Sequence, residues 1–234
     1  DSGQWGLAFH YITRDNWDVG IYHVQGHDKK PSFVLDYIEV PGSPQPVPVS
    51  YRLRYFEDIK GTAASFTTVL GETNVQGELS FLDGTPLVNA AGDPERGDLL
   101  KGQLGGSHVF GPTFLADDTV LTFEGFYAEV TSADADELRF DDSAWGYSLL
   151  GEFSYNNVLQ GWDVKVPVYF KHDLDGTLQE LQVFDGARVL SLGITGIYLN
   201  NLNLGLTYAI YDGGGLTYLL SDRDNIALTL KYSF

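Results

Sequence analysis

Apolar and polar side chains alternate through the last ten residues of this chain. Ile226, Leu228, Leu230, Tyr232 and Phe234 fall on one side of an extended segment, and polar or small residues separate them. A period of two is typical of a β-strand with one apolar and one polar face. The strand belongs either to a half-buried sheet of a soluble protein or to a transmembrane β-barrel. In the barrel, the final strand carries its aromatic end to the membrane interface.

The same alternation recurs along most of the sequence. It predicts strands at 4–13, 17–27, 31–40, 50–57, 61–70, 73–82, 99–109, 118–131, 143–156, 161–172, 187–199, 201–211 and 223–234. Many of them run about nine to thirteen residues, which is longer than the usual soluble strand and long enough to cross a bilayer at a tilt. The apolar sides often begin or end on Trp, Tyr or Phe, as an aromatic girdle requires.

These strands predict an all-β fold, an antiparallel transmembrane β-barrel of about 12–14 strands that occupies residues 1–234 as one domain. Long connections, such as Asp83–Asp98 and Ser132–Asp142, alternate with short ones. We therefore expect the long connections outside the cell and the short turns in the periplasm. The segment Gly42–Pro48 holds three prolines and is expected to leave the sheet. Because single-chain bacterial barrels have an even strand number, thirteen strands imply a miscount or the C-terminal part of a longer barrel.

Composition excludes several classes of protein. The 234 residues include no cysteine, which excludes disulfide scaffolds and cysteine metal sites, and no apolar run as long as a transmembrane helix, which excludes a helical membrane protein. The net charge of -18 leaves no basic stripe for nucleic acid. The acidic segments between strands either keep the loops soluble, face lipopolysaccharide with its divalent ions, or bind calcium. The spacing of a calcium loop is absent from both acidic segments, Asp83–Asp98 and Ser132–Asp142. The five histidines are scattered and predict no metal site.

Charged side chains lie opposite the apolar stripes of the predicted strands. At the lipid face, Arg or Lys would cost about 2–4 kcal/mol each near the midplane, so we expect these residues to line the lumen. They either line a water-filled path for a solute or pair across a closed lumen. The lumen-lining candidates are Arg52, Arg54, Glu78, Lys101, Gln103, Glu124, Glu152, Asp163, Lys165 and Lys231.

Motifs of catalysis are scarce. The chain has no Gly-x-Ser-x-Gly, no His-Glu-x-x-His and no glycine-rich phosphate loop. A barrel lipid hydrolase would need a serine and a histidine together, and the candidates are Ser107 with His108, or His172 with Asp173. Neighbouring strand residues point to opposite faces, so neither pair is expected to meet. We expect no enzyme, no catalytic residues and no cofactor.

Several short motifs occur in a recognisable order. They are Tyr55-Phe56-Glu57-Asp58-Ile59, Phe140-Asp141-Asp142-Ser143-Ala144-Trp145-Gly146-Tyr147, His172-Asp173, Ser221-Asp222-Arg223-Asp224 and the final Tyr232-Ser233-Phe234. Together they resemble the C-terminal part of a proteobacterial outer-membrane family, domain of unknown function 1302, whose members are about twice as long. The terminal Tyr232 and Phe234 also resemble the assembly signal of outer-membrane barrels.

The resemblance implies a protein of the outer membrane of a Gram-negative bacterium, with outer-membrane lipid, lipopolysaccharide and the barrel assembly machinery as partners. It also implies a periplasmic partner and an inner-membrane exporter of the resistance-nodulation-division type. We therefore expect a transport or channel component for hydrophobic or amphiphilic solutes or lipids. The alternatives are a structural or adhesion barrel with acidic external loops and, third, a barrel lipid hydrolase.

Overall fold

The computed structural model describes residues 3–178 and 181–233. Its strands are β1 (Trp5–Ile12), β2 (Asp18–Gly26), β3 (Ser32–Ile38), β4 (Val47–Arg54), β5 (Ile59–Leu70), β6 (Thr73–Val88), β7 (Pro94–Gly111), β8 (Asp118–Val130), β9 (Ser143–Leu159), β10 (Trp162–Asp175), β11 (Arg188–Tyr198), β12 (Leu202–Asp212) and β13 (Asn225–Tyr232). Within these ranges, the short 3-10 helices η1 (Ala135–Glu137) and η3 (Gly215–Thr217) lie in loops. Among the described residues, no helix has the length and apolar character needed to cross a membrane.

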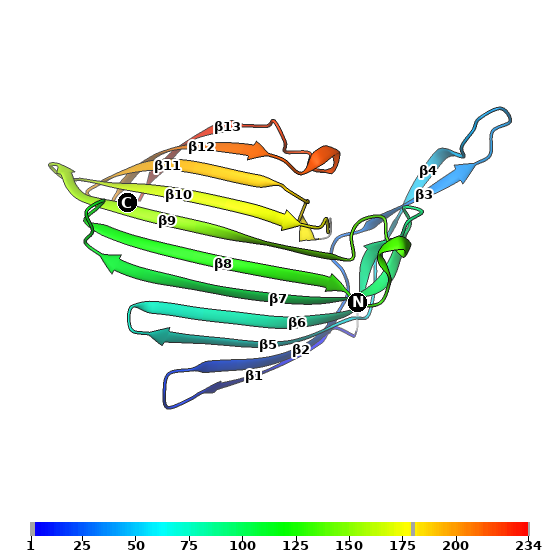
Figure 1. The fold of residues 1–234 in the computed structure, drawn as a ribbon, viewed down its shortest axis with the longest axis horizontal. Coiled ribbons are helices and arrows are strands. Elements are labelled where there is room, and N and C mark those ends of the chain that lie inside the picture. Colours follow the sequence, from blue (N-terminus) through cyan, green and yellow to red (C-terminus); the bar gives the residue numbers. More distant parts are fainter. Residues whose placement is uncertain (1–2, 179–180, 234) are drawn as a thin grey trace.

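Eleven strands form one antiparallel sheet in the order β1-β2-β5-β6-β7-β8-β9-β10-β11-β12-β13 (Figure 1). The strands β3 and β4 form a separate hairpin, which projects from one end of the sheet (Figure 1). The predicted all-β antiparallel fold is therefore confirmed. In the described residues the edge strands β1 and β13 do not pair with each other, so the sheet is open and closure into a barrel stays a prediction.

Cross-strand register gives the sheet two different faces. Val168 pairs with Leu192, Leu192 with Tyr208, and Tyr208 with Ile226, and paired residues point to the same side. Leu192 is 44% exposed and Ile226 is 72% exposed. We call this side the apolar face and the opposite side, which carries Lys165, the polar face.

The three longest connections of the main sheet, 131–142, 176–187 and 213–224, lie at one end, together with the extended β6–β7 hairpin and the β3–β4 hairpin, and the connections at the other end span only two to six residues (Figure 1). We call these the long-loop end and the short-turn end. The turn between β9 and β10 is one of the tightest, and Gly161 takes a positive φ of 79° there, which glycine adopts without a steric penalty.

Two details of the strand map needed correction. The prediction of a long loop over Asp83–Asp98 was wrong. After a register shift between Leu82 and Thr85, β6 continues as far as Val88, and β7 already begins at Pro94. That irregularity breaks the alternation by which sequence analysis recognises a strand. The proline-containing segment is also shorter than expected, since β4 begins at Val47 and Pro48 pairs with Tyr37 at a register shift of the hairpin.

A compact apolar core lies on the polar face at the long-loop end. In this core, side chains of strands β6, β7, β8 and β9 pack against the connection between β10 and β11. Its buried members are Leu87, Leu99, Ala128, Val130, Ala144, Leu178 and Val183. Ala128 and Ala144 are each 1% exposed, and their small side chains leave room for that connection to pack against the sheet. We call its described residues, 176–178 and 181–187, the inward loop.

Candidate functional site

Seven of the charged candidates lie in the eleven-stranded sheet, and the register places all seven on the polar face. They are Glu78, Lys101, Glu124, Glu152, Asp163, Lys165 and Lys231. They do not form one cluster. Glu78, Lys101 and Glu124 gather midway along the sheet beside Gln103, whereas Asp163 accepts a 2.7 Å hydrogen bond from the Asn157 backbone and supports a turn.

Arg52 and Arg54 are placed elsewhere. Both lie on β4 in the projecting hairpin, outside the eleven-stranded sheet. Arg52 is 72% exposed, with its Nε 3.9 Å from Oδ1 of Asp36. Arg54 donates to the Pro94 carbonyl at 3.3 Å, and its guanidinium lies 4.5 Å from the ring centre of buried Phe56. Arg52 therefore contacts a residue within the hairpin, Arg54 contacts residues at its base, and neither arginine lies with the other seven candidates.

A polar cavity of about 280 Å³ opens on the polar face beside Glu78, Gln103 and Glu124. It contains a chain of hydrogen-bonding side chains from three strands. Nδ1 of His10 lies 3.3 Å from Oδ1 of Asp18, and Nε2 of His10 lies 2.9 Å from Oη of Tyr22. The Tyr22 hydroxyl lies 3.3 Å from Oγ of Ser65. This network links an acid, an imidazole and two hydroxyl groups.

No sequence motif singles out His10, Asp18, Tyr22 and Ser65. Their alternation alone places them on the polar side of β1, β2 and β5, but only the register shows that they meet. Ile12 pairs with Asp18 across the first turn and Gly20 pairs with Ser65. The first of these pairings is signalled by the short connection between β1 and β2. The second spans the whole β3–β4 excursion, and no local pattern reports it.

A second cavity of about 290 Å³ adjoins the first, since Glu78, Gln103 and Glu124 line both. We call it the mixed cavity, because it has an apolar wall formed by Phe126, Leu181 and Val183 and also carries Lys101 and Lys171. Two of its apolar residues, Leu181 and Val183, come from the inward loop, so the loop forms part of the cavity.

An ion pair between partly exposed Lys171 and buried Asp173 anchors the inward loop. Asp173 is 2% exposed, and its Oδ1 lies 3.0 Å from Nζ of Lys171. Its Oδ2 accepts hydrogen bonds from Lys171 and from the Phe184 backbone, each at 3.2 Å. The Phe184 ring packs 5.2 Å from that of Tyr218. Burial raises the pKa of the Tyr218 hydroxyl, and Tyr211 and Asp173 act in the same direction, so Tyr218 stays neutral around pH 7.

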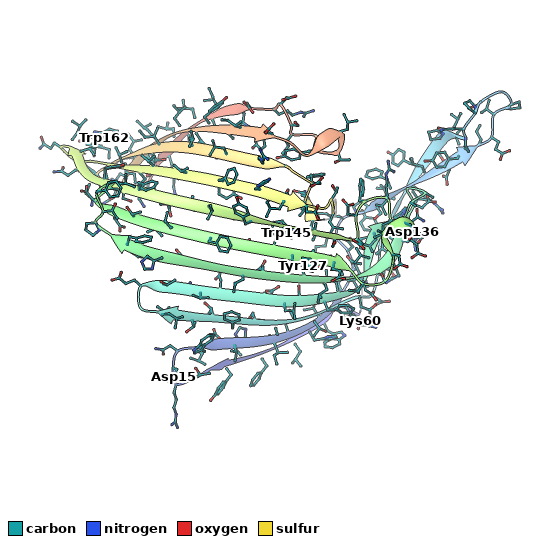
Figure 2. The ribbon with its side chains drawn as sticks, viewed as in Figure 1. Asp15, Lys60, Tyr127, Asp136, Trp145 and Trp162 are labelled. Atoms are coloured by element: carbon teal, nitrogen blue, oxygen red, sulfur yellow. The ribbon has the colours of Figure 1, made fainter. Side chains whose placement is uncertain are left out.

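The apolar face carries its charges at one edge only. In the described part of the eleven-stranded sheet, Asp, Glu, Lys and Arg occur on this face only near the long-loop end, as Lys60, Asp83, Arg96, Asp98, Glu129, Asp175, Arg188 and Asp212. Aromatic residues stand at both ends: Tyr127 and Trp145 lie toward the long loops, and Trp162 lies at the short turns (Figure 2). The result is an apolar band between two aromatic zones.

The proposed catalytic pairs do not assemble. Ser107 lies on the polar face and accepts from Thr122 at 3.0 Å, while His108 lies on the apolar face, 2.6 Å from Thr73. His172 accepts a hydrogen bond from Arg188 at 3.3 Å on the apolar face, whereas Asp173 is buried on the other. Among the described residues, no group of three or more His, Cys, Asp or Glu side chains is arranged to hold a metal ion.

The C-terminal aromatic residues were expected to form an assembly signal. Tyr232 pairs with Leu202 and lies on the apolar face with 62% of its surface exposed. Phe234 lies outside the described residues.

The geometry defines an all-β protein built on a long antiparallel sheet with an apolar face and a polar, cavity-bearing face. A family model described as a protein of unknown function, DUF1302, matches residues 1–234, and the chain belongs to that family. No curated protein and no solved structure matches the chain.

Proposed function

We propose that this chain forms an antiparallel β-barrel in the outer membrane of a Gram-negative bacterium and conducts hydrophobic or amphiphilic solutes or lipids along its polar face. The single observation that carries the proposal is the contrast between the two faces. In the described residues the apolar face is exposed and free of Asp, Glu, Lys and Arg away from its long-loop edge, whereas the polar face holds two adjoining cavities with charged residues.

The dimensions of the apolar face fit a bilayer. The ten steps from Trp162 to His172 on β10 span about 33 Å at about 3.3 Å per residue. A strand tilt of about 40° reduces this to about 25 Å, the height of the apolar band of an outer-membrane barrel. The charged residues of the apolar face near the long-loop end, such as Lys60, then lie at the membrane interface, where a charged side chain costs little free energy. The proposed orientation puts the long-loop end outside the cell.

Planar-bilayer recording tests the proposal. Folded protein, identified by its heat-dependent mobility in gel electrophoresis, should produce discrete conductance steps. The variant Ser80→Trp, which fills space in the mixed cavity, should reduce the step size, and Ser43→Trp in the exposed tip of the hairpin should not. Folded protein that inserts into the bilayer without conducting would contradict a conducting path.

A structural or adhesion barrel is the second candidate, because one feature favours it. The β3–β4 hairpin projects from the long-loop end (Figure 1) and exposes Phe33 at 64% and Tyr51 at 66%. If the hairpin carries the function, its removal should abolish cell-surface adhesion while the barrel still folds, and the barrel should not conduct.

A further inference from the structure

Two carboxylates of the mixed cavity lack compensating contacts. Within the described residues, the side chains of Glu78, Glu124 and Lys101 make no hydrogen bond or ion pair. The ammonium of Lys171 is already neutralised by buried Asp173. Among the described residues, this leaves two negative charges against one positive charge around the cavity, and the described lining of the adjoining polar cavity adds Asp18 but no lysine or arginine. The electrostatic balance therefore favours a positively charged occupant.

The same cavity already accommodates one ammonium group. Nζ of Lys171 lies 5.9 Å from the ring centre of Phe126, within the range of a cation–π contact, while the Asp173 carboxylate neutralises it. An aromatic ring beside carboxylates is the environment that an organic ammonium ion prefers. Glu78 and Glu124 are the exposed carboxylates on the other strands that line this cavity.

The apolar wall restricts the class of ligand further. Phe126, Leu181 and Val183 form one side of the cavity, and Val183 is 3% exposed within the packed core. A small inorganic cation would gain nothing from such a wall, because it contributes no apolar surface to bury. At about 290 Å³ the space is near the lower limit of small-molecule pockets, so it suits a head group with a short hydrocarbon segment.

We propose that the mixed cavity binds amphiphiles with a positively charged amine head group, in preference to anionic or neutral ones. The ammonium lies between Glu78 and Glu124, and the hydrocarbon segment lies against Phe126, Leu181 and Val183. This assignment deepens the proposed function, on which its meaning as a substrate preference rests, but the binding itself does not require conduction.

The test is a binding measurement with three probes of the same shape, on the full chain folded in neutral detergent. Isothermal titration calorimetry is run with 4-phenylbutylammonium, 4-phenylbutanoate and 4-phenylbutanol, all below their aggregation limits. The ammonium probe should bind at least about tenfold more tightly than either of the others, because a hydrogen bond between charged groups is worth about that factor. Equal affinity for the three probes, or preference for the carboxylate, would overturn the proposal.

Charge-removal variants locate the site. Glu78→Gln with Glu124→Gln should weaken binding of the ammonium probe by about tenfold or more and leave the alcohol unaffected. The matched control, Glu39→Gln with Glu72→Gln, removes the same net charge from the hairpin and from a short turn, and should bind as the unmodified chain does. If both double variants lose affinity equally, the preference reflects net charge and not this cavity. Because the measurement is made in micelles, binding without conductance in bilayers would overturn the proposed function alone.

Discussion

At the scale of single residues, the carboxylates on the polar face differ in burial and in pairing. Asp173 is almost completely buried, forms an ion pair with Lys171 and accepts a hydrogen bond from the Phe184 backbone. Glu78 and Glu124 are exposed and make no such contact with a described residue. The first arrangement fixes the inward loop, and the second leaves carboxylates available to a solute.

The ion pair gives a prediction for stability. Lys171→Met would leave the Asp173 carboxylate buried without its countercharge, and breaking a buried pair in this way costs about 3–5 kcal/mol. Urea unfolding of the folded protein in detergent measures the loss. Lys165→Met, at an exposed position on the same strand, should change stability by less than about 1 kcal/mol. Equal losses for the two variants would show that the pair does not anchor the loop.

At the scale of the elements, the sequence predicted most of the strands and their faces, because alternation is a local property. All thirteen predicted strands are present, and the seven charged candidates of the main sheet share one face. Three features escaped prediction. The β6–β7 extension follows an irregularity, the polar network around His10 depends on long-range pairing, and the separation of the β3–β4 hairpin depends on β2 pairing directly with β5. Local patterns carry no information on such pairings.

The two faces of β10 give a test of orientation. Val166 lies on the apolar face and Lys165 on the polar face. If the apolar face meets lipid near the midplane, Val166→Arg should destabilise the folded state by about 2–4 kcal/mol. Lys165→Val should have a much smaller effect on stability, since it removes a charge from the wet side. Reversible unfolding in lipid vesicles measures both. The opposite order of losses would mean that the polar face meets lipid, because exchanging the faces exchanges the two effects.

At the scale of the whole molecule, the sheet is bounded by β1 and β13, whose outer backbone groups have no strand partner in the described residues. A lipid environment does not tolerate unpaired backbone donors and acceptors, because each costs several kcal/mol. In a membrane, the two edges must therefore pair with each other or with additional strands.

Hydrogen exchange distinguishes a closed sheet from an open one. In a barrel closed by this chain, the amides of β1 and β13 should exchange nearly as slowly as those of the central strand β8 after insertion into vesicles. If the edges remain open, every second amide of β1 and β13 should exchange far faster than those of β8. Mass spectrometry of exchanged peptides measures the difference, and the same chain unfolded in urea is the control for intrinsic rates.

The shared wall of the two cavities has a consequence for movement. Glu78, Gln103 and Glu124 line both spaces, so a solute that leaves one cavity for the other keeps contact with the same side chains throughout. In the proposed transport, the solute would move in small steps and would not have to regain its full hydration shell between two separate sites. Rapid transit depends on sites that are close together and individually weak. The shared wall would therefore lower the barrier between the cavities, and hold a solute only briefly in either of them.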